Sequence, residues 1–290
     1  MPRIVIDGIG LVYEFLGPVG GQPMALTPGG RFHMDTPGVR GLAQALAAGG
    51  RRVLIYDRPN CGRSDACLTG ESESAMQAEA LLGLIRALDL GPTAIVGGSG
   101  GSRVSLLAAA RDPDLCSHLA LWWISGGPIG LMQLATFYCG EPAVLASMGG
   151  MDAVIQATSW AENIALNPAV APFLRAIGTQ RFIAVMQQWA AAYAPDPLSP
   201  VPGMRPADFA RLTMPTLVLR SDNSDLSHTR ATSEWVHRLI PQSRLLDPPW
   251  QAGEWNRQLG RMQSGQGNGL FSGWHALAPL LLEFTDPRAQ

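Results

Sequence analysis

Short apolar runs alternate with stretches of helical periodicity along most of this 290-residue chain, and this alternation restricts its fold more than any other feature. Helical spacing is clearest at Leu81, Leu84, Ile85 and Leu88, which follow the i, i+3, i+4, i+7 pattern of one helix face. The apolar runs lie at residues 53–56, 94–96, 119–124, 216–219 and 244–246. Continuous apolar strands separated by helices predict an α/β fold with a mostly parallel central sheet and helices on both faces.

Two regions depart from this alternation. Near the start, the β-rich residues 4–6 and 11–15 flank the turn signal Asp7-Gly8, which predicts an antiparallel hairpin. From about residue 127 to residue 207 the strand pattern stops, and Met, Ala, Phe and Trp occur in broad helical stretches. We interpret this region as a helical insertion whose large apolar side chains pack between helices and in part line a pocket over the sheet.

All 21 basic residues of the chain are arginines, so lysine chemistry is excluded. The chain cannot form a Schiff base, a pyridoxal phosphate linkage, a phosphate-loop lysine site or a Ser-x-x-Lys hydrolase site. The net charge of −2 provides no basic field, so we expect no binding to nucleic acid or to a membrane surface. A small apolar molecule is the expected partner, and the sequence leaves open whether the chain forms a homodimer.

The four cysteines predict neither a metal site nor a redox pair. They have no C-x-x-C spacing and no nearby His at metal-ligand intervals: Cys61, Cys67, Cys116 and Cys139. We therefore expect free, buried thiols, no metal and no cofactor. No basic stretch followed by an apolar run comes after Met1, and no apolar window of about 18 residues occurs, so we expect a cytoplasmic protein.

The segment 97–101 has the pattern of a nucleophile turn. It reads Gly-Gly-Ser-Gly-Gly, follows the apolar run 94–96 and precedes a helix marked by Val104 and Leu107. A serine on so sharp a turn needs small neighbours, because a Cβ would collide with the adjacent strand and helix. A Gly-rich turn before a helix can also cradle a phosphate, but without a lysine we favour Ser99 as a nucleophile.

At this strand, G-x-S-x-G, helix segment, the chain resembles the α/β-hydrolase fold family in its serine-nucleophile, cap-bearing form. Residues 57–65, Asp-Arg-Pro-Asn-Cys-Gly-Arg-Ser-Asp, look like the family's D-x-x-G-x-G-x-S loop, and residues 215–219 resemble the strand before its catalytic acid. The resemblance implies a first core segment over residues 1–127, a helical cap over 128–207 and a second core segment over 208–290. It also implies a hydrolase whose Ser99 attacks a carbonyl carbon.

The same resemblance locates an oxyanion hole. The family takes one amide from the residue after the nucleophile, here Gly100, and one from an earlier loop. Residues 27–31, Thr-Pro-Gly-Gly-Arg, stand where the family has His-Gly-Gly or similar, although Thr or Pro replaces its His. Gly29 or Gly30 then supplies the second amide.

The acid and the base are harder to assign. The loop after residues 216–219 contains Asp222 and Asp225, and we favour Asp225 because Asp225-x-x-His228 resembles an Asp-x-x-His-Pro subgroup of the family. Most of the family has a His after the last strand, whereas Glu254 stands there, and a carboxylate is a weak base for a serine hydroxyl. We favour His228 as the base, keep His275 as the second choice, and leave open that no His serves.

Three activities stay open. The first is hydrolysis of an ester, lactone or similar carbonyl bond of an apolar small molecule through an acyl-enzyme. The second is hydrolysis of a carbon–carbon bond in a vinylogous diketo acid, with Arg31, Arg58 or Arg63 paired with its carboxylate. The third, prompted by Glu254, is a non-hydrolytic lyase, cyclase or small-molecule binder. The residues that we expect to contact the substrate are His33, Trp123 and Trp160.

Overall fold

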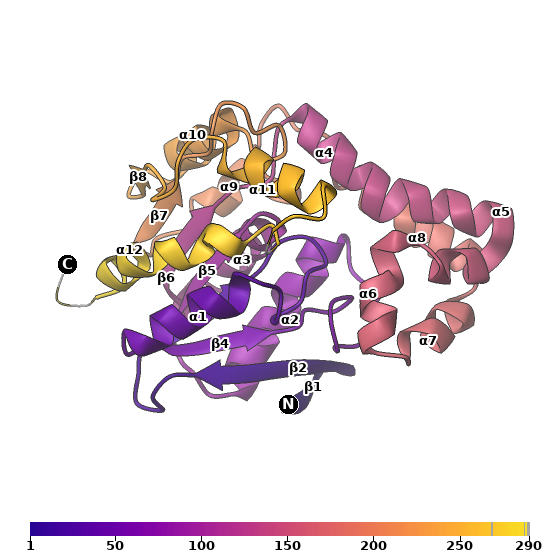
Figure 1. The fold of residues 1–290 in the computed structure, drawn as a ribbon, viewed down its shortest axis with the longest axis horizontal. Helices are drawn as coiled ribbons and strands as arrows, with labels where there is room; N and C mark the ends of the chain where they lie inside the picture. Colours follow the sequence, from indigo (N-terminus) through magenta and orange to yellow (C-terminus); the bar gives the residue numbers. More distant parts are fainter. Residues whose placement is uncertain (268, 287, 289–290) are drawn as a thin grey trace.

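The computed structural model describes residues 1–267, 269–286 and 288, in which helices flank a central sheet and a group of further helices lies at one end (Figure 1). The strands are β1 (Arg3–Ile6), β2 (Ile9–Leu16), β3 (Pro23–Thr27), β4 (Arg52–Tyr56), β5 (Thr93–Gly98), β6 (Cys116–Trp122), β7 (Thr216–Leu219) and β8 (Arg244–Leu246). Their order in the sheet is β1-β2-β4-β3-β5-β6-β7-β8. β1 pairs antiparallel with β2 and β2 with β4, whereas all the later pairs are parallel, so the predicted mostly parallel α/β sheet is confirmed.

The expected hairpin joins β1 to β2. Asp7 and Gly8 have φ angles of 49° and 81°, a conformation that Gly and Asp tolerate better than other residues. Ile6 and Ile9 form the first pair beyond this turn. The polar turn between two apolar segments therefore determines where the sheet begins.

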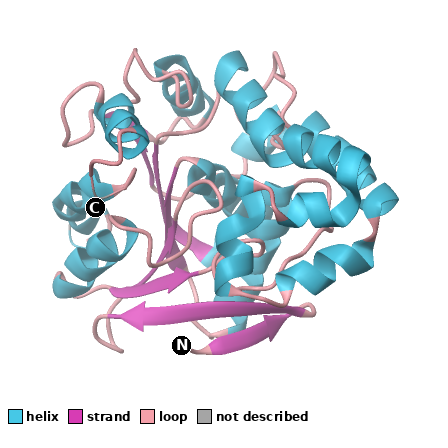
Figure 2. Ribbon diagram, turned by 45° about the vertical axis from the view of Figure 1, so that its right-hand side comes forward, coloured by secondary structure: helices cyan, strands magenta, loops and turns pink. Residues whose placement is uncertain are grey.

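Alternate residues of each inner strand point to opposite faces of the sheet, and each face has its own helices (Figure 2). Leu54 and Ile95 pack under α2 (Glu73–Ala87), α3 (Gly100–Arg111) and α10 (Arg230–Leu239). Val53 and Val96 pack on the other face under α1 (Val39–Ala48), the turn η3 (Ser272–Leu277) and α12 (Ala278–Phe284). Burial on both faces explains why the sequence of these strands is continuously apolar.

Helices α4 to α8 lie between β6 and β7, in the region of the expected insertion (Figure 1). They are α4 (Pro128–Ala135), the π turn η2 (Thr136–Gly140), α5 (Glu141–Ile155), α6 (Thr158–Leu166), α7 (Val170–Ile177) and α8 (Thr179–Ala191). Trp160, Phe182, Met186 and Trp189 belong to a hydrophobic cluster of these helices that is separate from the two clusters of the sheet. The remaining elements are η1 (Pro113–Leu115), α9 (Pro206–Phe209) and α11 (Glu254–Gln263).

Candidate active site

Ser99 lies at a strained turn between β5 and α3. Its φ of 56° and ψ of −129° are unusual for a residue with a side chain. A Cβ at Gly98 would stand 2.1 Å from the indole nitrogen of Trp122, and a Cβ at Gly101 would stand 2.1 Å from the carbonyl oxygen of Thr27. The glycines beside Ser99 are therefore required by close approach, as the sequence predicts, and the turn projects the serine side chain into a cavity.

The Ser99 hydroxyl is hydrogen-bonded to a histidine from a distant loop. Its Oγ lies 2.8 Å from Nε2 of His228, and Nδ1 of the same ring lies 2.9 Å from Oδ2 of Asp225. The His228 and Asp225 side chains are each only 2% exposed. This chain of two hydrogen bonds can transfer the hydroxyl proton to the imidazole while the carboxylate fixes the ring and stabilises its charged form.

The loop after β7 brings Asp225 and His228 together as a unit. Oδ1 of Asp225 accepts the backbone N–H groups of Ser227 and His228, each at 2.9 Å, which closes a tight turn. This turn leaves Oδ2 free to accept from the ring. Trp123 stacks on the imidazole at 5.9 Å and Trp255 meets it edge-on at 4.5 Å, so aromatic side chains shield the ring from water.

Two backbone amides converge next to Ser99. Gly100 is the first residue of α3, so its N–H has no acceptor within the helix. The N–H of Gly30 lies 3.1 Å from the position that a Cβ on Gly100 would occupy. Nη2 of the buried Arg58 donates to the carbonyl oxygen of Gly29 at 3.0 Å. Because the Gly29–Gly30 peptide is planar and trans, its N–H, on Gly30, points in the direction opposite to that carbonyl. These amides can stabilise an oxyanion formed on the carbonyl that Ser99 attacks.

A cavity of about 320 Å3 opens over the Ser99–His228 pair. Core loops supply one wall, and α4, η2 and the segment after α8 supply the other, so the cavity lies where these helices meet the sheet. Its apolar lining residues are Phe32, Leu134, Phe137, Tyr138, Tyr193, Trp255, Leu259, Leu270 and Phe271. The charged and polar side chains that line it include those of Arg58, Glu73, Gln77, Arg103 and Ser125.

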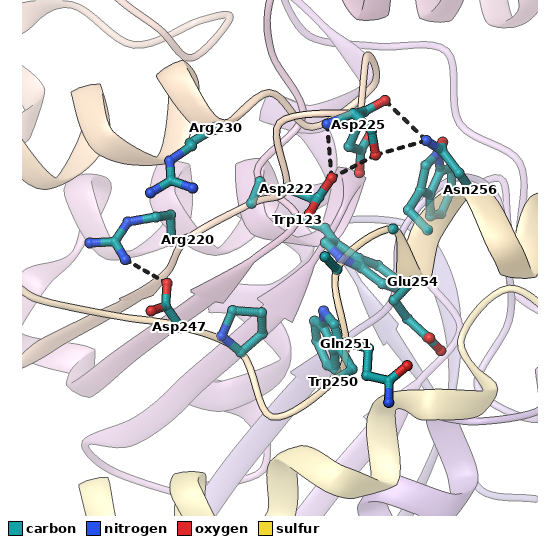
Figure 3. A pocket seen from close by; sticks show the side chains of 16 residues that line it. Trp123, Arg220, Asp222, Asp225, Arg230, Asp247, Trp250, Gln251, Glu254 and Asn256 are labelled. Atoms are coloured by element: carbon teal, nitrogen blue, oxygen red, sulfur yellow. Dashed lines mark hydrogen bonds and ion pairs between the residues drawn. The ribbon is translucent and has the colours of Figure 1, made fainter.

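A second hollow lies behind Asp225 (Figure 3). There Asp222 accepts hydrogen bonds from the backbone and side chain of Ser224, which lower the pKa of its carboxyl group. Asp222 is therefore the solvated turn residue that the sequence offers as the alternative acid. Figure 3 shows the Glu254 carboxylate turned away from Asp225, where it accepts from Arg257 at 2.6 Å and from Gln258 at 2.7 Å.

Comparisons with known proteins agree with this architecture. The family model for the alpha/beta hydrolase fold matches residues 29–124. The enol-lactonase from Burkholderia xenovorans LB400 is 20% identical with a TM-score of 0.59, and the match covers 98% of this chain and 99% of that one. The meta-cleavage product hydrolase from Pseudomonas fluorescens IP01 is 19% identical with a TM-score of 0.59, covering 98% and 97% of the two chains. The chain has the α/β-hydrolase fold.

A curated relative of this α/β-hydrolase fold protein matches over a shorter stretch. The 2-hydroxy-6-oxononadienedioate/2-hydroxy-6-oxononatrienedioate hydrolase 1 of Dechloromonas aromatica (strain RCB) is 32% identical over 112 residues. The match covers 36% of this chain and 39% of the relative. The chain thus spans well under half the length of the curated relative in this alignment.

In this structure, several residues favoured from the sequence lie away from the cavity lining. His275 is exposed and its Nδ1 bonds the carbonyl oxygen of Ser272, so the second-choice base is not at Ser99. Trp160 is fully buried under the guanidinium of Arg31, which lies 4.2 Å from its ring centroid. Trp123 packs behind His228. Neither tryptophan is among the residues that line the cavity over Ser99. Aromatic content alone does not show which way a ring faces.

The other sequence candidates for contacting substrate also have protein partners. His33 lies 3.4 Å from Glu162 of α6, and this contact raises the pKa of its imidazole above its ordinary value. Arg31 pairs with Glu73 at 3.0 Å and Arg63 with Asp35 at 2.8 Å. Arg58 is hydrogen-bonded to the backbone carbonyls of Gly29 and Gly30 in the oxyanion loop.

Sequence reasoning missed several cavity residues that carry polar groups, among them Glu73, Arg103 and Ser125. Glu73 opens α2, Arg103 lies one turn after Ser99 in α3, and Ser125 follows β6. A signal for Arg103 was present, because a charged residue stands among the apolar residues of a buried helix.

The structure gives no indication of a metal centre or a membrane span in the residues it describes. No cluster of three His, Cys, Asp or Glu side chains within residues 1–267, 269–286 and 288 has the arrangement of a metal site. In the same part of the chain, no helix has the length and apolarity to cross a bilayer. The four cysteines are free and buried, as expected.

Proposed function

We propose that this chain is a serine hydrolase that cleaves an ester, lactone or similar carbonyl bond of a small molecule through an acyl-enzyme. The observation that carries the proposal is the hydrogen-bonded series from Ser99 Oγ through His228 to Asp225, at 2.8 Å and 2.9 Å. An imidazole so placed is the base that a neutral serine hydroxyl needs. Because His228 supplies this imidazole, Glu254 at the usual position of the base no longer favours the non-hydrolytic alternative.

The proposed reaction has two halves. Ser99 Oγ adds to the carbonyl carbon while His228 takes its proton, and the N–H groups of Gly100 and Gly30 bind the oxyanion. Collapse of this intermediate expels the alcohol, which takes the proton from His228, and leaves Ser99 acylated. Water, deprotonated by the same imidazole, then adds to the acyl group and releases the acid.

The cavity supports a substrate of modest size. Its volume of about 320 Å3 falls in the usual range for small-molecule sites, and most of its walls are apolar. Leu134, Phe137, Tyr138 and Tyr193 come from the helical region after β6, which we assign as the cap of the fold. A mainly apolar molecule with a few polar groups fits such a lining.

Hydrolysis of a carbon–carbon bond is a second candidate. Two comparison proteins carry names of that class, the meta-cleavage product hydrolase and the oxononadienedioate hydrolase. The same Ser99, His228 and oxyanion amides would serve, with a stabilised carbanion as the leaving group in place of an alcohol. The buried guanidinium groups around the cavity favour an acidic substrate of this kind.

Turnover of a small panel of substrates tests the proposal. Short-chain aryl esters, aryl-substituted lactones and vinylogous diketo acids are compared on the wild-type enzyme and on the Ser99→Ala variant. We expect at least one class to be hydrolysed, with loss of nearly all turnover in the variant. Undiminished turnover by Ser99→Ala would overturn the assignment of the nucleophile, and the preferred class separates the two candidate reactions.

A further inference from the structure

Arg103 lies close to the reacting centre and has no counterion among the residues that the structure describes. It is 4% exposed, it lines the same cavity as Ser99, and it stands one helical turn after Ser99 in α3. A Cβ added to Gly100 would lie 3.8 Å from Nη2 of Arg103. The same Cβ position would lie 3.1 Å from the backbone nitrogen of Gly30. The guanidinium is therefore a neighbour of both oxyanion amides.

The protein itself leaves much of this guanidinium unsatisfied. Nη2 lies 3.3 Å from the hydroxyl of Tyr193, whose ring centroid is 4.8 Å from the guanidinium carbon. The buried Nε has no hydrogen-bond partner, and no ion pair is formed by Arg103 with the residues that the structure describes. A buried charge in this state is costly unless something else pairs with it.

The other charged groups around the cavity are already paired. The carboxylate of Glu73 accepts from Nε of Arg31 at 3.0 Å and from Nδ2 of Asn60 at 2.8 Å. Arg58 donates to carbonyls of the oxyanion loop and to Gln77. Of the described acidic residues, Glu73 alone lines the cavity, so the two lining arginines leave an excess of positive charge there.

We propose that Arg103 binds a carboxylate of the substrate and so selects molecules that carry an acid group near the scissile carbonyl. A guanidinium offers a planar pair of donors that matches a carboxylate, and burial strengthens the pairing. The Tyr193 hydroxyl stands beside the same group and can donate to the acid. This inference rests on the proposed function for the scissile bond, but the binding of the acid group does not depend on turnover.

A matched pair of esters tests the selection. The p-nitrophenyl half ester of adipic acid carries a free carboxylate, and the corresponding adipamate carries a neutral amide of similar shape. On the wild-type enzyme we expect kcat/KM to be about 10- to 100-fold higher for the acid, the range of a hydrogen bond to a charged group. In Arg103→Gln this ratio should fall to near one, whereas Arg103→Lys should retain part of it.

Arg86→Gln provides the matched control. Arg86 lies on the exposed side of α2 and pairs with Asp112, so the same loss of charge outside the cavity should leave the ratio unchanged. A wild-type ratio at or below one would overturn the inference, and so would an Arg103→Gln ratio equal to that of the wild type. The wild-type comparison needs no variant, so it decides the matter even if Arg103→Gln does not fold.

A binding measurement separates this inference from the proposed function. In Ser99→Ala, which cannot form an acyl-enzyme, titration calorimetry with the two esters should show tighter binding of the acid by a similar factor. Preferential binding without turnover by the wild type would support Arg103 as the acid-binding residue and contradict the hydrolase. Equal turnover of both esters by the wild type would support the hydrolase and contradict the role of Arg103.

Discussion

The hydroxyl oxygen of Ser99 and Nε2 of His228 lie 2.8 Å apart, although 129 positions separate the two residues in the sequence. Parallel strands bring them together, because β5 and β7 end at the same edge of the sheet. The acid and the base both come from the single loop after β7, with Asp225 only three residues before His228. The sequence favours His228 as the base because Glu254 stands after the last strand, where most of the family has a His.

Removing either member of the Asp225–His228 pair should abolish most of the activity. His228→Ala leaves Ser99 without a base, and we expect kcat to fall on the order of 10²- to 10⁴-fold. Asp225→Asn should lower kcat to a similar or larger extent, because an amide favours the wrong imidazole tautomer. Steady-state kinetics on an aryl ester measure both effects. His275→Ala is the control, and an equal loss in that variant would contradict the assignment.

Replacing Glu254 should have little effect on catalysis. Its carboxylate pairs with Arg257 and Gln258, and Glu254→Gln keeps its shape while removing its charge. We expect kcat/KM to change by less than about threefold, because the ion pair that the variant loses is with Arg257, which is partly exposed at the start of α11. The measurement is the pH profile of kcat/KM. A profile that loses its acidic limb in Glu254→Gln would identify Glu254, in place of His228, as the base.

A methyl group at position 29 should block the nucleophile. A Cβ there would stand 2.4 Å from Cβ and 2.8 Å from Oγ of Ser99, closer than such atoms approach. We therefore expect Gly29→Ala to lose at least about 10²-fold in kcat, the effect of one displaced oxyanion donor or more. Gly41→Ala is the matched control, because nothing lies within 4 Å of its added methyl group. That change in α1 should stabilise the protein by up to about 1 kcal/mol without affecting kcat.

The contact between His33 and Glu162 should make stability depend on pH. Glu162 raises the pKa of His33 in the folded protein, so the pair contributes fully below the ordinary pKa of about 6.5 and is lost as the pH rises through the raised value. The free energy of unfolding of Glu162→Gln should be lower than that of the wild type by at most about 1 kcal/mol near pH 5.5, because Glu162 is half exposed. Near pH 8.5 the difference should vanish.

Chemical denaturation at both pH values measures this difference. Glu71→Gln is the control, since Glu71 pairs with Arg111, whose guanidinium keeps its charge over this range. Its effect should be the same at both pH values. A destabilisation by Glu162→Gln that grows toward alkaline pH would contradict the assigned pairing.

Local sequence patterns were sufficient to predict the fold and the turn at Ser99. The apolar runs correspond to β4, β5, β6, β7 and β8 because a strand covered on both faces has to be apolar throughout. The glycines around Ser99 could be interpreted because their reason is steric and local. Structural features whose physical cause lies in neighbouring residues can therefore be predicted from a single sequence.

Side-chain directions could not be predicted in the same way. The choice between His228 and His275 depended on a turn in which the Asp225 carboxylate binds two backbone amides, and no spacing in the sequence shows that turn. Trp160 and Trp123, which the sequence predicts to contact the substrate, pack on Arg31 and His228 outside the cavity lining. Each of these outcomes depends on contacts between segments that are remote in the chain.

Labelling with a fluorophosphonate probe tests the central claim most directly, because the probe reacts with a serine hydroxyl only where a neighbouring base activates it. Peptide mapping by mass spectrometry should find the label on Ser99 of the wild-type protein, and labelling should be slowed by orders of magnitude in His228→Ala while His275→Ala is labelled normally. A folded wild-type protein that remains unlabelled at Ser99, or a His228→Ala variant that is labelled as fast as the wild type, would contradict the account.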